Sequence, residues 1–268
     1  MKILLSTGCL YENPLSDVFE IARISGFDGI EFLIDKNKYN IPANELKDLC
    51  RKYDVPILSI HSPFVECDGW GGFWESIDRS IELAKELSVN LVNFHPQRGV
   101  ILYHNLGSKL LDYIGRCRQT VKNSKIILTI ENLPNPKHID KIPLLRRMLP
   151  SFADNTCQIA EFARDNDIHV TFDTTHIGTT GRDILNIYNI FKGTIANIHL
   201  SDYDGTTQHL LPGRGNLPLK EFLGMIKDDK YDGLITLETQ PSAIGAKDMQ
   251  KAISNAKYCI SYIRDKCF

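Results

Sequence analysis

The chain of 268 residues is 43% hydrophobic and 24% charged, and its 31 basic and 33 acidic residues give a net charge of −2. This apolar content is enough for a sizeable core and excludes a collagen-like, coiled-coil or disordered chain. The charge balance disfavours a protein held on nucleic acid mainly through phosphate contacts. No apolar run is long enough to span a membrane.

The N-terminal segment and the cysteines indicate a cytoplasmic protein without a membrane partner. Met1–Ser6 leads directly into a strand-like segment and lacks the apolar region and cleavage site of a signal peptide. The seven cysteines are scattered, and no two have the Cys-x-x-Cys spacing of a zinc ribbon or redox dithiol. We therefore expect reduced thiols.

Short β-rich runs alternate with amphipathic stretches along the whole chain. The predicted strands are Lys2–Thr7, Gly29–Leu33, Pro56–His61, Leu91–His95, Lys125–Glu131, His169–Asp173, Ile195–Leu200 and Leu234–Glu238. The predicted helices include Leu15–Ser25, Glu45–Tyr53, Phe73–Leu87, Lys109–Lys122, Cys157–Asp165, Leu217–Lys227 and Lys247–Ile263. Several strands are nearly continuous apolar runs, which is typical of strands covered by helices on both faces.

Eight strand-then-helix units in 268 residues predict the α/β class and a single (β/α)8 TIM barrel, with residues 1–268 forming one domain. A doubly wound sheet is the alternative, but its glycine-rich phosphate-binding turn is absent from Thr7–Pro14. The long connection from Glu131 to His169 is rich in proline and predicts an extra helix around Leu144–Leu149. No linker or change in composition divides the chain.

Histidines and carboxylates stand at or just after the ends of the last six predicted strands. They are His61, His95, Glu131, Asp173, His176, His199, His209 and Glu238. Since the C-terminal ends of barrel strands converge on one rim, we expect these side chains to point into one bowl. Imidazoles and carboxylates without thiolates favour zinc, manganese, cobalt or iron over magnesium. A metal would also offset the cost of burying Glu131 and Glu238 at the ends of apolar strands.

The other three histidines are not expected to bind metal. His104, His138 and His169 fall on helix or loop positions or near a strand start.

These motifs resemble those of the xylose isomerase-like barrel superfamily, which contains sugar isomerases and epimerases as well as endonuclease IV. The resemblance covers most of the chain and is strongest from His95 onward, and Gly26–Glu31 is similar to the second-strand region of the isomerase branch. That branch holds one divalent ion with a Glu, Asp, His, Glu quartet. The resemblance therefore implies a quartet of Glu131, Asp173, His199 and Glu238.

The endonuclease IV branch, AP endonuclease family 2, binds three zinc ions, and the sequence matches its ligands in all eight of the residues named above. Asn93–Pro96, Gly213–Asn216 and Asp228–Gly233 are also similar to that branch. Two departures stand out. Thr207 occupies the position of a carboxylate ligand, and Ser6–Cys9 replaces the strand-ending histidine with its small-residue turn.

The favoured function is a divalent-metal-dependent isomerase or epimerase that acts on a small sugar or sugar phosphate through a metal-stabilised enediolate. We expect zinc or manganese, one to three ions per chain, with Glu131 and Glu238 as the acid and base. The resemblance implies that His61 and His176 contact substrate oxygens. Arg214 could hold a phosphate or carboxylate or lie in solvent. The aromatic segment Trp70–Trp74 could cover a sugar face or pack at a helix start.

The alternative function is an endonuclease IV-like zinc phosphodiesterase acting on abasic DNA, with two metals bridged by Glu131 and with Phe64 and Val65 as a wedge. His95 and His209 exceed what one metal requires and favour this hydrolase. Thr207, the near-neutral charge and the different N-terminal third favour the isomerase. A sugar-binding barrel without catalysis is a third possibility, but it does not explain a complete set of ligands.

Overall fold

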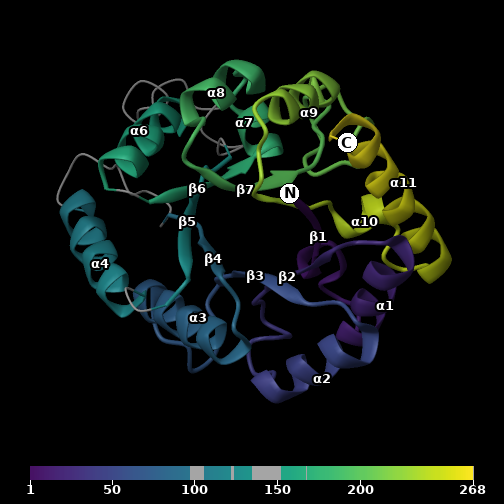
Figure 1. Ribbon diagram of the computed structural model, residues 1–268, viewed down its shortest axis with the longest axis horizontal. Helices are drawn as coiled ribbons and strands as arrows, with labels where there is room; N and C mark the ends of the chain where they lie inside the picture. Colours follow the sequence, from purple (N-terminus) through teal and green to yellow (C-terminus); the bar gives the residue numbers. More distant parts are fainter. Residues whose placement is uncertain (97–105, 122–123, 135–151, 167, 268) are drawn as a thin grey trace.

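Eight parallel strands close into a barrel in which each strand pairs with the next and β8 pairs with β1 (Figure 1). The computed structural model describes residues 1–96, 106–121, 124–134, 152–166 and 168–267. The strands are β1 (Lys2–Ser6), β2 (Gly29–Leu33), β3 (Ile57–His61), β4 (Leu91–Phe94), β5 (Ile127–Glu131), β6 (His169–Asp173), β7 (Ile195–Leu200) and β8 (Leu234–Leu237). The predicted (β/α)8 TIM barrel is confirmed, and all eight predicted strands are present with small differences at their ends.

The helices form a ring around the strands (Figure 1). They are α1 (Leu15–Ser25), α2 (Ala43–Tyr53), α3 (Phe73–Leu87), α4 (Leu106–Val121), α6 (Phe152–Asp165), α7 (Thr174–Thr179), α8 (Ile184–Phe191), α9 (Leu219–Asp228), α10 (Pro241–Ile244) and α11 (Met249–Cys267), with a 3-10 turn η1 (Thr7–Leu10). The named predicted helices are present, whereas α7, α8 and α10 were not predicted. The helix expected around Leu144–Leu149, together with His104 and His138, lies outside the described residues.

Helices α1, α2 and α3 end in left-handed caps before the next strand, and Gly26 is an example. Gly26 follows α1 with φ +85°, and its N–H donates to the carbonyls of Ala22 and Arg23. Glycine adopts this conformation without the steric cost that other residues incur. The cap therefore ends α1 and directs the chain toward β2.

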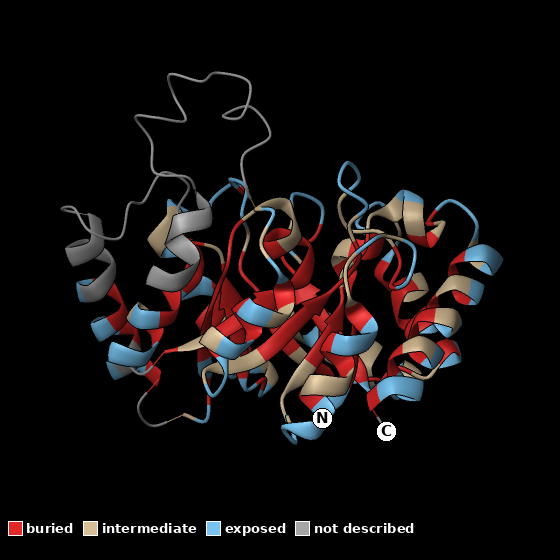
Figure 2. Ribbon diagram, turned by 90° about the horizontal axis from the view of Figure 1, so that it is seen from above, coloured by how far each residue is buried: buried red, intermediate tan, exposed pale blue. Residues whose placement is uncertain are grey.

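The hydrophobic core lies between the strands and the helix ring, where Figure 2 shows the buried residues. Phe172 of β6 stacks on Phe222 of α9, with ring centroids 5.5 Å apart, and meets Tyr188 and Phe191 of α8 edge to face. Aromatic pairs in this geometry add to the free energy gained by burial. This packing holds β6 and the helices beside it in place.

The barrel interior, by contrast, contains a layer of hydrogen-bonded polar side chains. Side chains alternate along a strand, so the residue two positions before a strand-ending side chain points the same way. Thr129 accepts from Thr171 at 2.8 Å and donates to Asn93 at 3.1 Å. Thr236 donates to Asn197 at 3.0 Å, and all of these side chains are buried. The strands predicted as apolar runs thus carry a polar support beneath the rim.

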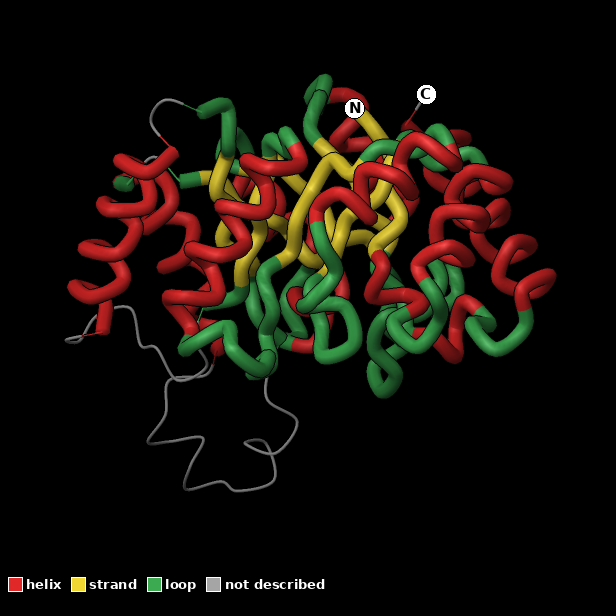
Figure 3. The backbone as a smooth tube through the Cα atoms, turned by 90° about the horizontal axis from the view of Figure 1, so that it is seen from below, coloured by secondary structure: helices red, strands yellow, loops and turns green. Residues whose placement is uncertain are grey.

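The longer loops gather at one end of the barrel, and the two chain termini lie at the other (Figure 3). The loop end is where the carboxyl ends of the strands converge, so it carries the strand-ending residues of interest. Among the described helices, none is both long and apolar enough to cross a membrane.

Candidate metal centre

Four side chains at the strand ends, the quartet, converge at the rim: Glu131 at the end of β5, Asp173 at the end of β6, His199 in β7 and Glu238 just after β8. One ligand atom from each lies within 4.8 Å of the others. The Nδ1 atom of His199 is 2.8 Å from Glu238 Oε2, 3.3 Å from Glu131 Oε2 and 4.0 Å from Asp173 Oδ2. Glu238 is 17% exposed, whereas the His199 side chain is fully buried.

The donor atoms of the quartet fit a divalent cation. Within the described part of the chain, Glu131 Oε1, Asp173 Oδ2 and His199 Nδ1 are buried without a hydrogen-bond partner. Leaving such atoms unpaired costs free energy, and more so for charged groups. Three carboxylates and one imidazole nitrogen form a donor set suited to zinc or manganese. A bound cation would satisfy the three atoms at once.

Glu31, in the middle of β2, determines which nitrogen of His199 faces the quartet. Its carboxylate oxygens lie 3.1 and 3.2 Å from His199 Nε2 across the barrel. Glu31 also accepts from Ser59 at 2.8 Å and from Asn197 at 3.1 Å, and it is fully buried. A carboxylate on the far nitrogen fixes the imidazole tautomer and leaves Nδ1 as a lone-pair donor.

His61 presents an unprotonated nitrogen to Glu131 in its neutral form. Its Nδ1 lies 2.7 Å from the Ser62 carbonyl, which can only accept, so Nδ1 carries the proton. Nε2 then lies 3.3 Å from Glu131 Oε2 with two lone pairs facing each other. Either a second proton or a metal ion relieves this contact. His61, Glu131 and His199 form a second candidate ligand group.

A third candidate ligand group contains Asp173, His176 and His209. His176 Nδ1 lies 2.9 Å from the Asn132 carbonyl, and His209 Nδ1 lies 3.2 Å from the Glu238 carbonyl. These contacts leave Nε2 of each ring as the lone-pair nitrogen. In the sequence, Thr207 occupies the position of the carboxylate ligand that would accompany His176 and His209. In the structure, Asp173 supplies a carboxylate beside these two histidines.

His95 lies beside the quartet but belongs to none of these three groups. Its Nε2 is 3.1 Å from Glu131 Oε1, and its side chain is 20% exposed. The ring stacks on Phe64, with centroids 5.4 Å apart, and Phe64 is 54% exposed. The structure thus brings all eight predicted residues to one rim. His95 is the most exposed of the histidines that contact Glu131.

Opposing effects of burial and charge set the pKa values of the histidines. Burial by itself would lower the pKa of His199, but the carboxylates of Glu31, Glu131 and Glu238 outweigh it and raise the pKa well above its usual range. Burial would lower the pKa of His176, but Asp173 and Glu131 outweigh burial and raise this pKa to about 9. Burial lowers the pKa of His95 below its usual value.

The pKa values of the carboxylates shift in different directions. Burial would raise the pKa of Glu131, but His95 and His199 hold it well below its usual range. Asp173 has a raised pKa, chiefly because it is buried. Without a metal, protons on His199 and His176 neutralise the cluster, and a divalent ion would replace them.

Two asparagines hold Glu131 and Asp173 in place within the cluster. The Asn93 amide donates to Glu131 Oε2 at 2.6 Å. Asn132 accepts from the backbone N–H of Asp173 at 2.8 Å and donates to the Asp173 carbonyl at 3.0 Å. The His176 N–H donates to Asp173 Oδ1 at 2.6 Å, which leaves Oδ2 for the cluster. Such partners hold the ligands in place before an ion binds.

The loop after β7 is organised by Asp202, a fully buried carboxylate. Its Oδ2 accepts from the backbone N–H groups of Gly213 and Gly215, each at 2.9 Å, and its Oδ1 accepts from Tyr203 and Leu217. A side chain at Gly215 would approach Asp202 Oδ1 to 2.5 Å, so this position requires glycine. Hydrogen bonds between Asp202 and the segment Gly213–Asn216 therefore fix the loop that carries His209.

A cavity of about 480 Å³, the metal-side cavity, opens beside the quartet. Glu238 and His209 line it on one side, and Tyr11, Leu33 and Phe64 line it on another. Such a mixture of apolar walls and a few polar groups is typical of small-molecule sites. An occupant of the cavity can therefore reach Glu238.

A second cavity of about 390 Å³ lies on the other side of Phe64, where His95 and Phe73 also line it. Within the aromatic segment, Trp74 packs against Tyr113 with ring centroids 4.4 Å apart, and the Trp70 indole donates to the Tyr39 carbonyl at 3.1 Å. Trp70 and Trp74 thus pack at the start of α3, and only Phe73 of the segment's three aromatic residues lines this cavity.

Arg214 lies away from both of these cavities. Its guanidinium stands over the ring of Tyr258 in α11, 5.1 Å from the centroid, and the residue is exposed. It lines neither the metal-side cavity nor the cavity beside His95. His169, which was not expected to bind metal, starts β6 at the opposite end from the rim.

Glu31 and Asp202 were not among the predicted site residues. Glu31 falls in the segment Gly26–Glu31 that the resemblance singled out, so a carboxylate within a buried strand was the available signal. Asp202 stands three residues after His199, ahead of the Gly-x-Gly segment that it binds. Both act by positioning other groups, and strand-end patterns do not distinguish that role from ligation.

Comparison with known proteins gives one family and a set of similar folds. A family model described as the xylose isomerase-like TIM barrel matches residues 19–259. An uncharacterized protein of Mycobacterium tuberculosis (strain ATCC 25618 / H37Rv) is 26% identical over 258 residues, which cover 91% of this chain and 90% of that protein.

Among solved structures, a D-tagatose 3-epimerase-like protein has a TM-score of 0.69 and 22% identity, with all of both chains covered. The IolI protein with a bound zinc atom has a TM-score of 0.75 and 17% identity, with 99% of each chain covered. An AP endonuclease of family 2 from Brucella melitensis has a TM-score of 0.70 and 13% identity, covering 91% of this chain and 97% of that one. At these identities the likeness concerns the fold.

Proposed function

Because the chain belongs to the xylose isomerase-like TIM barrel family, we propose that it is a divalent-metal-dependent isomerase or epimerase of a small sugar or sugar phosphate. The observation that carries this proposal is the convergence of three buried ligand atoms without a hydrogen-bond partner, from Glu131, Asp173 and His199, next to Glu238. The similar folds of an epimerase-like protein and a zinc-containing protein support it.

The quartet would hold the ion, with zinc or manganese as the expected metals. When bound, a divalent ion supplies positive charge that stabilises negative charge developing on neighbouring substrate oxygens. Glu238 lines the metal-side cavity and is partly exposed, so its carboxylate can take a proton from substrate carbon. Glu131 lies on the other side of His199 Nδ1 and is the proposed second proton carrier.

We assign His61 and His176 to substrate oxygens in the one-metal form of the site. Both rings hold their Nδ1 protons on backbone carbonyls, so each presents Nε2 to an incoming group. Arg214 is left without a substrate role, because its guanidinium lies over Tyr258. A phosphate group on the substrate would need another partner.

The first test is the number of ions per chain, measured by elemental analysis of protein purified without chelators and after reconstitution with zinc or manganese. The proposal expects one tightly held ion, lost in Asp173→Asn. In His95→Ala the ion should be retained, because His95 belongs to none of the three ligand groups. Loss of a full metal equivalent in His95→Ala would contradict a one-metal site.

The second test is exchange of substrate carbon-bound hydrogen with deuterated water, followed by NMR over a panel of ketoses, aldoses and their phosphates. We expect metal-dependent exchange in the natural enzyme and a loss of at least about 100-fold in Glu238→Gln, since general acid–base groups contribute on the order of 10²–10⁴. Exchange that survives this substitution would remove Glu238 from its proposed role.

The additional ligand groups favour a second candidate, a zinc phosphodiesterase acting on abasic DNA. His61 with Glu131 and His199, and Asp173 with His176 and His209, provide sites beyond the quartet. Two or three zinc ions per chain would support this candidate. Incision of duplex DNA with an abasic site should then weaken as salt rises, because phosphate contacts release counterions. Absence of incision at low salt with added zinc would exclude it.

A further inference from the structure

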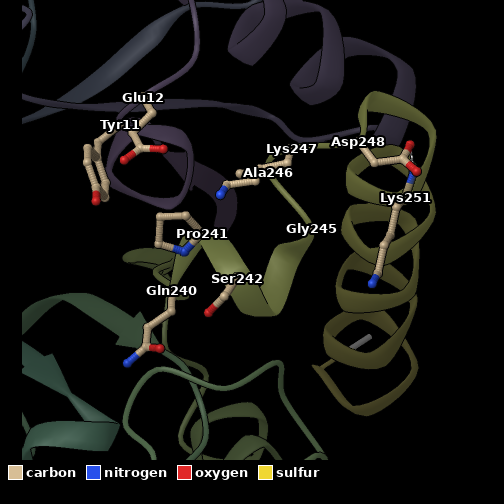
Figure 4. A pocket seen from close by; sticks show the side chains of 10 residues that line it. All are labelled: Tyr11, Glu12, Gln240, Pro241, Ser242, Gly245, Ala246, Lys247, Asp248 and Lys251. Carbon is tan, nitrogen blue, oxygen red and sulfur yellow. Dashed lines mark hydrogen bonds between the residues drawn. The ribbon is translucent and has the colours of Figure 1, made fainter.

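A larger cavity adjoins the metal-side cavity. This outer cavity has a volume of about 780 Å³ and is drawn in Figure 4. Tyr11, Gln240 and Pro241 line both cavities. Each cavity by itself falls within the range of roughly 300–1,000 Å³ that is usual for ligand pockets. A molecule that occupies both can extend from Glu238 to the start of α11.

The outer cavity is polar but carries no net charge. Lys247 and Lys251 line it together with Glu12 and Asp248, so two cations balance two anions. Figure 4 shows the Lys247 ammonium reaching into the cavity between Glu12 and Pro241. A phosphate site would instead need an excess of basic groups. The charge balance therefore favours a neutral occupant.

The remaining lining suits a ring that bears hydroxyl groups. Gln240 and Ser242 add an amide and a hydroxyl, so the wall can both donate and accept hydrogen bonds. Tyr11 is 42% exposed and lines both cavities, which places an aromatic side chain between them. Apolar area with a few polar groups is the combination that orients a small ligand.

The wall between the cavities is fixed by contacts of its own. The Tyr11 carbonyl accepts from the buried Lys38 at 2.6 Å, and Lys38 also pairs with Asp35 at 2.8 Å. Asn13 donates to the Ala246 carbonyl at 3.0 Å, which ties the loop after β1 to the loop after α10. A preformed wall lowers the entropic cost of binding.

The same wall is coupled to the metal centre. The backbone N–H of Gln240 donates to the carbonyl of His209 at 2.8 Å, and Gln240 follows Glu238 by two residues. An occupant of the outer cavity that contacts Gln240 therefore lies next to the groups that face the ion.

We infer that the outer cavity is a second carbohydrate subsite, so that the substrate is a glycoside. Its reacting sugar, which carries the free carbonyl group that an enediolate requires, occupies the metal-side cavity beside Glu238, and a neutral hydroxylated ring occupies the space between Tyr11 and Lys247. This inference rests on the proposed function, because it names the substrate class of the same site. A free or phosphorylated monosaccharide needs only the metal-side cavity, whereas a glycoside also occupies the outer cavity.

The test is isothermal titration of the zinc-loaded protein with matched probes: glucose, galactose and fructose, their 6-phosphates, and disaccharides that contain them. At least one disaccharide should bind about 10-fold or more tightly than its component monosaccharide, which corresponds to about 1.4 kcal/mol. Ser242→Trp fills the outer cavity and should remove this gain while the affinity for the monosaccharide is kept. Ser261→Trp, on the exposed side of α11, is the matched control and should retain the gain.

The possible outcomes separate the inference from the proposed function. Disaccharides that bind no better than monosaccharides, or a gain that survives in Ser242→Trp, would overturn the subsite. Tighter binding of a 6-phosphate that Ser242→Trp abolishes would make the outer cavity an anion site and would also overturn it. A disaccharide gain that depends on Ser242, without metal-dependent carbon exchange on any sugar, would support the subsite and contradict the isomerase. Circular dichroism of both tryptophan variants checks that they fold.

Discussion

At the residue scale, each histidine of the centre has its far nitrogen assigned by the fold. Glu31 lies against Nε2 of His199, while backbone carbonyls accept from Nδ1 of His61 and His176. The nitrogen that remains on His61 and on His199 is the one directed at the carboxylates. This arrangement turns rings that could rotate or change tautomer into fixed donors, which is what a tight metal site requires.

Glu31→Gln should weaken zinc binding by about 10–100-fold, the range usual for partners of metal-binding histidines. The amide lacks the charge that raises the pKa of His199 and supports the imidazole as a donor. Competition with a chromophoric chelator measures the change. Ser59→Ala, which removes only one hydrogen bond to Glu31, is the control and should have a smaller effect. An unchanged affinity in Glu31→Gln would show that Glu31 does not orient the ligand.

Metal affinity should rise with pH. The folded pKa of His199 is raised well above its usual value, so at neutral pH this ring is protonated in the metal-free protein. An ion must displace that proton, and raising the pH removes the competition. Titration in buffers of different ionisation enthalpy should therefore show proton release at pH 7. Proton uptake, or an affinity that falls between pH 6 and 8, would contradict this assignment.

At the element scale, the loop between β7 and α9 depends on one carboxylate. Asp202 accepts hydrogen bonds from four backbone N–H groups, those of Tyr203, Leu217 and the two glycines of the turn. His209 has φ +55°, a conformation that costs free energy for a residue other than glycine and that the folded loop must enforce. The position of His209 in the third ligand group therefore depends on the folding of the whole loop.

Asp202→Ala should destabilise the protein by about 1–3 kcal/mol, the usual cost of leaving a buried hydrogen-bonding group unsatisfied. Urea unfolding followed by circular dichroism measures this loss. Asp204→Ala is the control, since Asp204 caps an exposed turn of the same loop through Thr206 and Thr207. If both variants unfold at the same urea concentration, Asp202 does not organise the loop.

At the scale of the whole molecule, the candidate ligands come from strands that are far apart in the chain. The quartet lies on β5 to β8, and His61 adds β3. A bound ion would thus link the ends of strands β5 to β8 to one another. Because an ion that binds only the folded state stabilises it by mass action, the metal centre and the stability of the barrel are linked.

Removal of metal should lower the unfolding temperature. With free zinc about 1,000-fold above its Kd, binding adds about 4 kcal/mol, which corresponds to several degrees for a barrel of this size. Differential scanning calorimetry with zinc and with EDTA measures the shift. Asp173→Asn, which removes one ligand, should show little difference between the two conditions. An equally large shift in that variant would place the stabilising ion elsewhere.

Sequence patterns alone were enough to predict the barrel and the set of residues at its rim. Strand and helix periods are local, and a closed parallel barrel brings all strand ends to one rim whatever the details of packing. The prediction that Glu131, Asp173, His199 and Glu238 converge follows from these two facts. Helix α8 was not predicted because Ile184–Phe191 is only eight residues long and mostly apolar, with Asn186 and Asn189 as its exposed polar positions.

Only the tertiary structure decided how those residues are used. Glu31 and His199 are 168 positions apart, and they meet because the barrel interior is narrow enough for side chains to touch across it. Arg214 turned toward Tyr258, and Asp173 joined His176 and His209, through loop geometry that no local period encodes. Local sequence determines which side chains reach the rim. The contacts that orient them depend on closure of the whole barrel, because their partners come from distant strands.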